Sequence, residues 1–192
     1  MKKFKELKVC GHRRSGTHYI TALISLNFLE SYDYIKIYEK HKTPKKLDVK
    51  DRKHIFFIYV WREFEEVAKS IFKMRKRFGI DENNFENFLN RNYCDMYNKN
   101  LNPKVKVENF NSSRIITKVG GGLKNVKMTP YEYWKHDYNM WNNLNVNNVM
   151  LVKYNDIINN FESTLLEIGK KIGSNKTKFE KINKKIGWTP IK

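Results

Sequence analysis

The sequence predicts an α/β fold in three layers, with a central, mainly parallel sheet flanked by helices. Strand candidates alternate with amphipathic helix candidates along the chain, and residues 54–61 (HIFFIYVW) form a continuous apolar run typical of a strand buried on both faces. A glycine-containing turn also joins a strand candidate to a helix start over residues 9–19. No Pro- or Gly-rich linker interrupts this alternation, so we expect one domain over residues 1–192.

The turn within residues 9–19 (VCGHRRSGTHY) predicts a phosphate-binding loop. Gly11 and Gly16 let the backbone turn its N–H groups toward an anion, and the helix that follows places the positive end of its dipole at the same point. The glycine spacing fits the nucleotide-triphosphatase pattern G-x-x-x-x-G-K-S/T, but Thr17 stands where that pattern has lysine. The loop therefore predicts a P-loop-like fold and argues against an ordinary kinase or ATPase.

A second candidate anion site follows the apolar run at 54–61. Arg62 comes directly after this run, and apolar residues at helical spacing over 64–74 predict a helix that carries Ser70 on its second turn, eight residues after Arg62. A guanidinium can fork onto a phosphate while a hydroxyl donates a third hydrogen bond. Arg62 and Ser70 are therefore candidates for binding a second phosphate.

These two segments resemble the sulfotransferase family. The string at 14–17 is similar to the family's K/R-S/T-G-T loop, which holds the 5′-phosphosulfate of 3′-phosphoadenosine 5′-phosphosulfate (PAPS). The strand followed by Arg and, eight residues later, Ser is similar to the family's 3′-phosphate site. The resemblance implies PAPS as donor and 3′,5′-adenosine bisphosphate (PAP) as product. It implies a donor site made of Arg14, Ser15, Gly16, Thr17, His18, Arg62 and Ser70.

The same resemblance implies a general base at His41. In cytosolic sulfotransferases the base is the His of a K-T-H-x-P string that follows a strand and precedes the 3′-phosphate Arg by a little over twenty residues. His41 follows a strand candidate at 34–38 and precedes Arg62 by twenty-one residues. The local string departs from the pattern, because Pro44 lies three positions after His41 rather than two. An imidazole is suited to accepting a hydroxyl proton near neutral pH.

A fourth match lies at 149–157, which resembles the family's strand that ends in Y-E-D-L. We expect Tyr154 and Asp156 to hold the chain near the nucleotide pocket rather than to perform chemistry. Thr129 and Glu132 predict a capping box before one helix, and Gly173 predicts the end of another. The resemblance covers roughly residues 5–77 and 129–173. Residues 78–128 are expected to be an insert that shapes the acceptor side, or alternatively an Asn-rich, poorly ordered loop.

The charge of the chain leaves a second class of partner open. The sequence has 38 Lys+Arg against 20 Asp+Glu, a net charge of +18, which by itself suggests nucleic acid. Lysine and asparagine are abundant almost everywhere, as an AT-rich coding genome would produce, and a basic cleft would also concentrate an anionic donor. No zinc knuckle, basic-zipper heptad or RNA-recognition motif is present. Nucleic acid is therefore the disfavoured partner.

No apolar stretch of the sequence is long enough to span a bilayer, and the first residues lack the apolar run of a signal peptide. The two cysteines, Cys10 and Cys94, form neither a disulfide framework nor a metal quartet. We therefore expect a reducing, cytoplasmic setting, with Cys10 serving packing.

The sequence as a whole predicts an enzyme that transfers a sulfuryl group from PAPS to a hydroxyl or amine of a small-molecule or glycan acceptor. His41 would take the acceptor proton, and Arg14 would neutralise developing charge. No metal is expected, because no carboxylate cluster follows a strand. Two alternatives remain: an ATP-dependent small-molecule or nucleotide kinase of the P-loop class, and a non-catalytic nucleotide- or nucleic-acid-binding protein.

Overall fold

The computed structural model describes residues 4–12, 14–28, 34–36, 44, 47–75, 82–90 and 128–182 of the 192-residue chain. The chain falls into two compact units, one made of Met1–Arg62 with Met140–Lys192 and the other of Glu63–Asn139. The sequence-based expectation of one domain over 1–192 stays a prediction.

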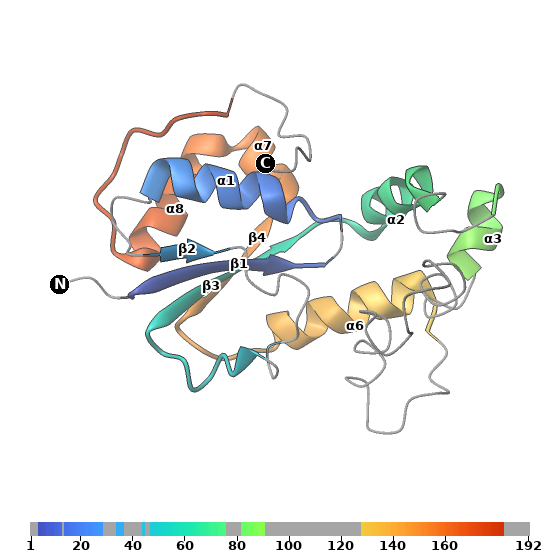
Figure 1. The fold of residues 1–192 in the computed structure, drawn as a ribbon, viewed down its shortest axis with the longest axis horizontal. Helices are drawn as coiled ribbons and strands as arrows, with labels where there is room; N and C mark the ends of the chain where they lie inside the picture. Colours follow the sequence, from blue (N-terminus) through green and yellow to red (C-terminus); the bar gives the residue numbers. More distant parts are fainter. Residues whose placement is uncertain are drawn as a thin grey trace, which may run out of the picture. The chain divides into compact units, whose positions relative to one another are not determined.

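A four-stranded sheet forms the centre of the first unit (Figure 1). The order of its strands across the sheet is β2-β1-β3-β4, and every described pairing is parallel. The strands are β1 (Glu6–Gly11), β2 (Tyr34–Lys36), β3 (Ile55–Trp61) and β4 (Val149–Lys153). The predicted α/β class, with a parallel sheet flanked by helices, is confirmed.

Three helices of the first unit lie over one face of this sheet: α1 (Thr17–Phe28), α7 (Tyr154–Asn159) and α8 (Phe161–Ile172) (Figure 1). Alternate strand residues point into this layer because side chains alternate between the faces of a strand. The buried core contains Leu7, Val9, Phe56, Ile58, Val60, Met150 and Val152 from the strands, with Ile20, Leu23, Ile24, Phe28, Ile157, Leu165 and Ile168 from the helices. This core holds the strands in place, and with them the strand ends at which the loops that follow begin.

The opposite face of β3 is also buried, as its apolar run predicts. Trp141, near the end of α6 (Pro130–Asn142), stacks on Tyr59 with ring centroids 4.9 Å apart and an interplanar angle of 20°. The Trp141 and Phe57 ring centroids lie 6.3 Å apart. Both faces of β3 are therefore covered, and its residues are all aliphatic or aromatic.

The predicted helix boundaries at Thr129 and Gly173 are present. The Thr129 N–H donates to Glu132 Oε2 at 2.7 Å, and the Glu132 N–H donates to Thr129 Oγ1 at 3.3 Å, which is the reciprocal capping box before α6. Gly173 follows α8 in the left-handed conformation at φ 82°, and the Ser174 N–H donates to the Gly169 carbonyl at 2.8 Å. Both helices therefore begin or end through local hydrogen bonds that the sequence encodes.

The second unit contains α2 (Phe64–Lys73), α3 (Phe85–Asn90) and most of α6. Its core is formed by Val67, Ile71, Phe88 and Tyr133. Within the expected insert at 78–128, the structure describes the helix α3, and positions 91–127 lie outside the described residues. In the part of the chain that the structure describes, no helix has both the length and the apolarity needed to cross a membrane.

The side chain of Asn148, directly before β4, connects β4 to the start of β3 and to the segment that leads into it. Its buried side-chain amide donates to the carbonyls of Val49 at 2.9 Å, Ile55 at 3.1 Å and Arg52 at 3.3 Å. We expect Asn148→Ala to lower the free energy of unfolding by about 2 kcal/mol, because buried carbonyls would lose their donor. Asn147→Ala, at the exposed neighbouring position, should change it by less than about 0.5 kcal/mol. Urea unfolding of both variants measures the difference, and equal values would contradict this role of Asn148.

Candidate functional site

The strand order creates a switch point between β1 and β3. From β1 the chain proceeds to β2 on one side, whereas β3 and then β4 lie on the other side. In open parallel sheets, ligands bind outside the carboxyl ends of the strands at such a switch point. Gly11 pairs with Val60 in the register of β1 and β3, so the segments after Gly11 and after Trp61 leave the sheet next to each other. Topology therefore places a candidate site at the loop after β1 and at Arg62.

The loop after β1 is a tight turn with two left-handed residues, Arg14 at φ 66° and Gly16 at φ 92°. The Ser15 N–H donates to the His12 carbonyl at 3.2 Å, and the Ser15 hydroxyl donates to the same carbonyl at 2.6 Å. The Gly16 carbonyl accepts a hydrogen bond from the Ile20 N–H at 3.1 Å, which opens α1. Amides of a helix's first turn have no acceptor in a preceding turn, so this end of α1 is suited to an anion.

Gly11 allows the loop to lie close to β3. A Cβ at position 11 would collide with the Val60 carbonyl oxygen and would lie 2.7 Å from Ser15 Oγ and 3.0 Å from Thr17 Cγ2. A side chain at this position would therefore push the loop away from the neighbouring strand. The sequence identified Gly11 through its spacing from Gly16, and the structure adds the contact that requires it.

Gly16 allows a second close approach, by the aromatic ring of Tyr154. A Cβ at position 16 would collide with this ring. The guanidinium carbon of Arg62 lies 4.9 Å from the centroid of the same ring. Arg62 and the loop after β1 therefore contact one common side chain at the carboxyl edge of the sheet.

Tyr19, on the first turn of α1, completes this group of aromatic and cationic side chains. Its ring meets that of Tyr154 edge to face, with centroids 6.1 Å apart and an interplanar angle of 68°. Burial raises the pKa of the Tyr19 hydroxyl above its ordinary value of 10.0, and the neighbouring Tyr154 raises this pKa further. Tyr19 therefore remains neutral at physiological pH.

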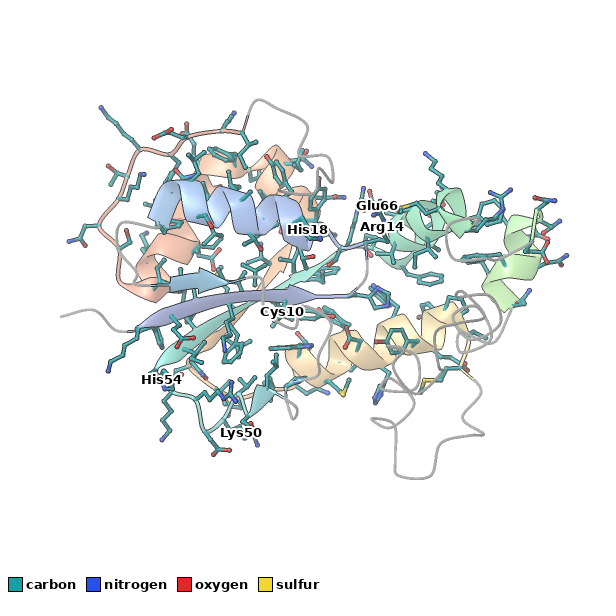
Figure 2. All side chains as sticks on the ribbon, viewed as in Figure 1. Cys10, Arg14, His18, Lys50, His54 and Glu66 are labelled. Atoms are coloured by element: carbon teal, nitrogen blue, oxygen red, sulfur yellow. The ribbon has the colours of Figure 1, made fainter. Side chains whose placement is uncertain are left out.

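The predicted site residues Arg14, Thr17 and His18 belong to the loop after β1 and the start of α1. Arg14 and His18 are exposed at the carboxyl end of β1, whereas His54 lies at the opposite end of the sheet (Figure 2). Thr17 is buried, and its carbonyl accepts a hydrogen bond from the Thr21 hydroxyl at 2.7 Å. Residues 14–18 and Arg62 are thus brought to one edge of the sheet, and their roles in binding stay predictions.

Ser70 and His41 are not placed with this group. Ser70 is a half-buried residue of α2 in the second unit, whereas Arg62 directly follows β3 and belongs to the first unit. His41 lies outside the described residues. A 3′-phosphate contact from Ser70 and a proton-accepting role for His41 therefore remain predictions.

Sequence reasoning missed a second cation beside the candidate site. The Lys153 ammonium lies 4.9 Å from the centroid of the Trp61 ring, and these two residues face each other in the register of β3 and β4. Each is the last residue of its strand. The sequence indicates that Trp61 and Lys153 each end a strand. Their contact can be inferred only once β3 and β4 are known to be neighbours in the sheet.

Cys10 packs in the sheet as expected, since it is 1% exposed and its thiol donates to the Ile58 carbonyl at 3.6 Å. Within the described ranges, no group of three His, Cys, Asp or Glu side chains is arranged to hold a metal ion. The expected absence of a metal stays a prediction.

Comparison with known proteins gives distant structural similarity but no match in sequence. No protein-family model matches the chain, and no curated protein matches its sequence. Among solved structures, the chain is similar to the mouse sulfotransferase SULT7A1 complexed with PAP, with 16% sequence identity and a TM-score of 0.49. The alignment covers 92% of this chain and 60% of that enzyme, so the chain spans about three-fifths of its length. At this similarity, function has to be argued from the site itself.

Proposed function

We propose that this protein is a sulfotransferase that moves a sulfuryl group from PAPS to a hydroxyl or amine of an acceptor. One observation carries the proposal: the two segments that resemble sulfotransferase phosphate sites follow β1 and β3, the strands on either side of the switch point. A donor with anionic groups at both its 5′ and 3′ positions requires two such segments. A ligand with a single phosphate would leave one of them unexplained.

The residues present fit this donor. The left-handed turn at Arg14 and Gly16, followed by the first turn of α1, would hold the 5′-phosphosulfate through backbone amides. The planar fork of Arg62 would bind the 3′-phosphate. Ser70 would add a hydroxyl to that phosphate, and Ser15 would serve the loop mainly through its hydrogen bonds to the His12 carbonyl.

In the proposed reaction, the chain positions the reactants and stabilises the charge that develops. These two effects dominate the catalysis of related group transfers. The bound donor supplies the sulfuryl group, and PAP remains after transfer. His41 would accept the proton of the acceptor hydroxyl as that oxygen bonds to sulfur. Arg14 and the first-turn amides of α1 would stabilise the negative charge that develops on the departing phosphate. A glycan hydroxyl is the favoured acceptor within this proposal.

Ligand-dependent melting tests the proposed donor against the kinase alternative. We expect PAP to raise the melting temperature of the full chain, with a stabilisation of about 2.7 kcal/mol at a hundredfold excess over its Kd. ATP with Mg²⁺ should stabilise the chain much less, because Thr17 replaces the lysine that nucleotide triphosphatases use. Stabilisation by ATP and Mg²⁺ alone, with a phosphotransferase activity lost on chelation, would establish the kinase instead.

Sulfate transfer to a panel of glycans and phenols then tests the chemistry. His41→Ala should lower turnover by roughly 10²–10⁴-fold while PAP binding is kept, as expected for loss of a general base. His54→Ala is the matched control, because this exposed histidine lies at the opposite end of the sheet (Figure 2). If both variants transfer sulfate like the original protein, His41 is not the base. PAP binding without turnover on any acceptor would favour a non-catalytic nucleotide-binding protein.

A further inference from the structure

Tyr154 is the side chain on which both candidate anion-binding segments converge. It contacts the loop at Gly16, and the guanidinium of Arg62 lies over its ring. We propose that Tyr154 is a positioning residue whose ring holds the Arg62 guanidinium beside the 14–18 loop, so that the 3′- and 5′-phosphate contacts act as a single preformed site. This inference rests on the proposed function, and it assigns Tyr154 no contact with the reacting atoms.

The first support is the fit between the Tyr154 ring and the loop backbone. The ring occupies the space in which a side chain at position 16 would begin, and Gly16 also has a φ of 92°, where residues with a Cβ are strained. Two independent constraints thus favour glycine at this position. A ring seated directly on the backbone leaves the loop little freedom to shift relative to Tyr154.

The second support is the way in which Arg62 meets the ring. Its guanidinium carbon is 4.9 Å from the ring centroid, within the range of a cation–π interaction. When a guanidinium lies flat on an aromatic ring, the contact uses its face, and its N–H donors point from its edges. Tyr154 can therefore restrict the direction of the Arg62 side chain without competing for the donors that a phosphate would use.

The third support is that Tyr154 is itself held from several sides. Trp61 and Lys153 are opposite each other in the β3–β4 register, so the residues that follow them, Arg62 and Tyr154, leave neighbouring strand ends. Tyr154 packs against the core of the first unit, and Tyr19 meets its ring edge to face. A residue fixed in this way can restrict Arg62 more than a solvated side chain could.

The test measures how the contribution of the 3′-phosphate depends on the ring. Calorimetric titration of the full chain gives the Kd of PAP and that of 5′-AMP, which lacks the 3′-phosphate. Tyr154→Leu removes the π face, and we expect the Kd of PAP to rise about tenfold while that of 5′-AMP changes less than twofold. Tyr154→Phe keeps the ring and should bind both ligands as the original protein does. Tyr154→Met, a flexible and unbranched alternative, replaces the Leu variant if that variant fails to fold.

A double-mutant cycle identifies the route of the effect. If Tyr154 acts through Arg62, then adding Tyr154→Leu to Arg62→Ala should produce no further loss of PAP affinity. An equal loss for PAP and 5′-AMP, or a Tyr154→Phe variant as weak as Tyr154→Leu, would overturn the inference, because the residue would then act on the loop or through its hydroxyl.

The same titrations separate this inference from the proposed function. If the original protein does not bind PAP, the proposed function fails. If it binds PAP and needs Arg62, but Tyr154→Leu binds PAP normally, only the positioning role of Tyr154 fails.

Discussion

Replacing Arg62 with alanine is expected to weaken PAP binding by about 1.5–3 kcal/mol, roughly ten- to hundredfold in Kd. This is the usual contribution of a hydrogen-bonding pair that involves a charged group. Arg62 directly follows β3 at the switch point, and its guanidinium carbon lies 4.9 Å from the centroid of the Tyr154 ring. Calorimetric titration with PAP measures the loss, and titration with 5′-AMP should show little change because that ligand has no 3′-phosphate.

Two variants control for charge and for general disturbance. Arg52→Ala removes the same charge just before β3, at the opposite end of that strand from Arg62, and should leave PAP affinity unchanged. Arg62→Lys keeps the charge but loses the planar fork, so its affinity should be intermediate. If Arg62→Ala binds PAP as tightly as Arg52→Ala does, Arg62 is not part of the nucleotide site and the proposed donor is wrong.

The elements around the site could be predicted because their signals are local. The apolar run at 54–61 predicted a strand buried on both faces, and β3 is buried from Ile55 to Val60. The glycine-containing turn predicted a strand, a loop and a helix start, which β1 and α1 provide. The caps at Thr129 and Gly173 depend on hydrogen bonds between residues a few positions apart. Such features are set by neighbouring residues in the chain and can be recognised there.

The convergence on Tyr154 could not be predicted, because it depends on strand order. Arg62 and Tyr154 are far apart in sequence and meet only because β3 pairs with β4 in the register that opposes Trp61 to Lys153. Strand order also sets the switch point, which turns two separate motifs into one candidate site. The sequence predicted Tyr154 to be structural and near the nucleotide pocket, but the contact with Gly16 that would give it a positioning role needs three-dimensional coordinates.

Replacing Gly11 with alanine is expected to destabilise the first unit by about 3 kcal/mol or more, at the upper end of what overpacking a core costs. The new methyl group would collide with the Val60 carbonyl, which the parallel pairing of β1 and β3 holds in place. Backbone in the middle of a sheet cannot rotate away as a flexible side chain can. Ser15 and Thr17 close the other side of the same space, so relief would require the loop to leave its position.

Gly169→Ala provides the matched comparison in the same unit. A Cβ at position 169, inside α8, would meet its nearest neighbour, Phe28 Cε1, at 3.5 Å, which is ordinary van der Waals contact. This change should therefore stabilise the protein by about 0.5–1 kcal/mol, since alanine is favoured over glycine within a helix. Urea unfolding of both variants gives the difference, and thermal melting with PAP shows whether Gly11→Ala also removes the response to ligand. The close approach at Gly11 involves both the loop and β3. If Gly11→Ala left the stability unchanged, the loop would not pack on β3 as described.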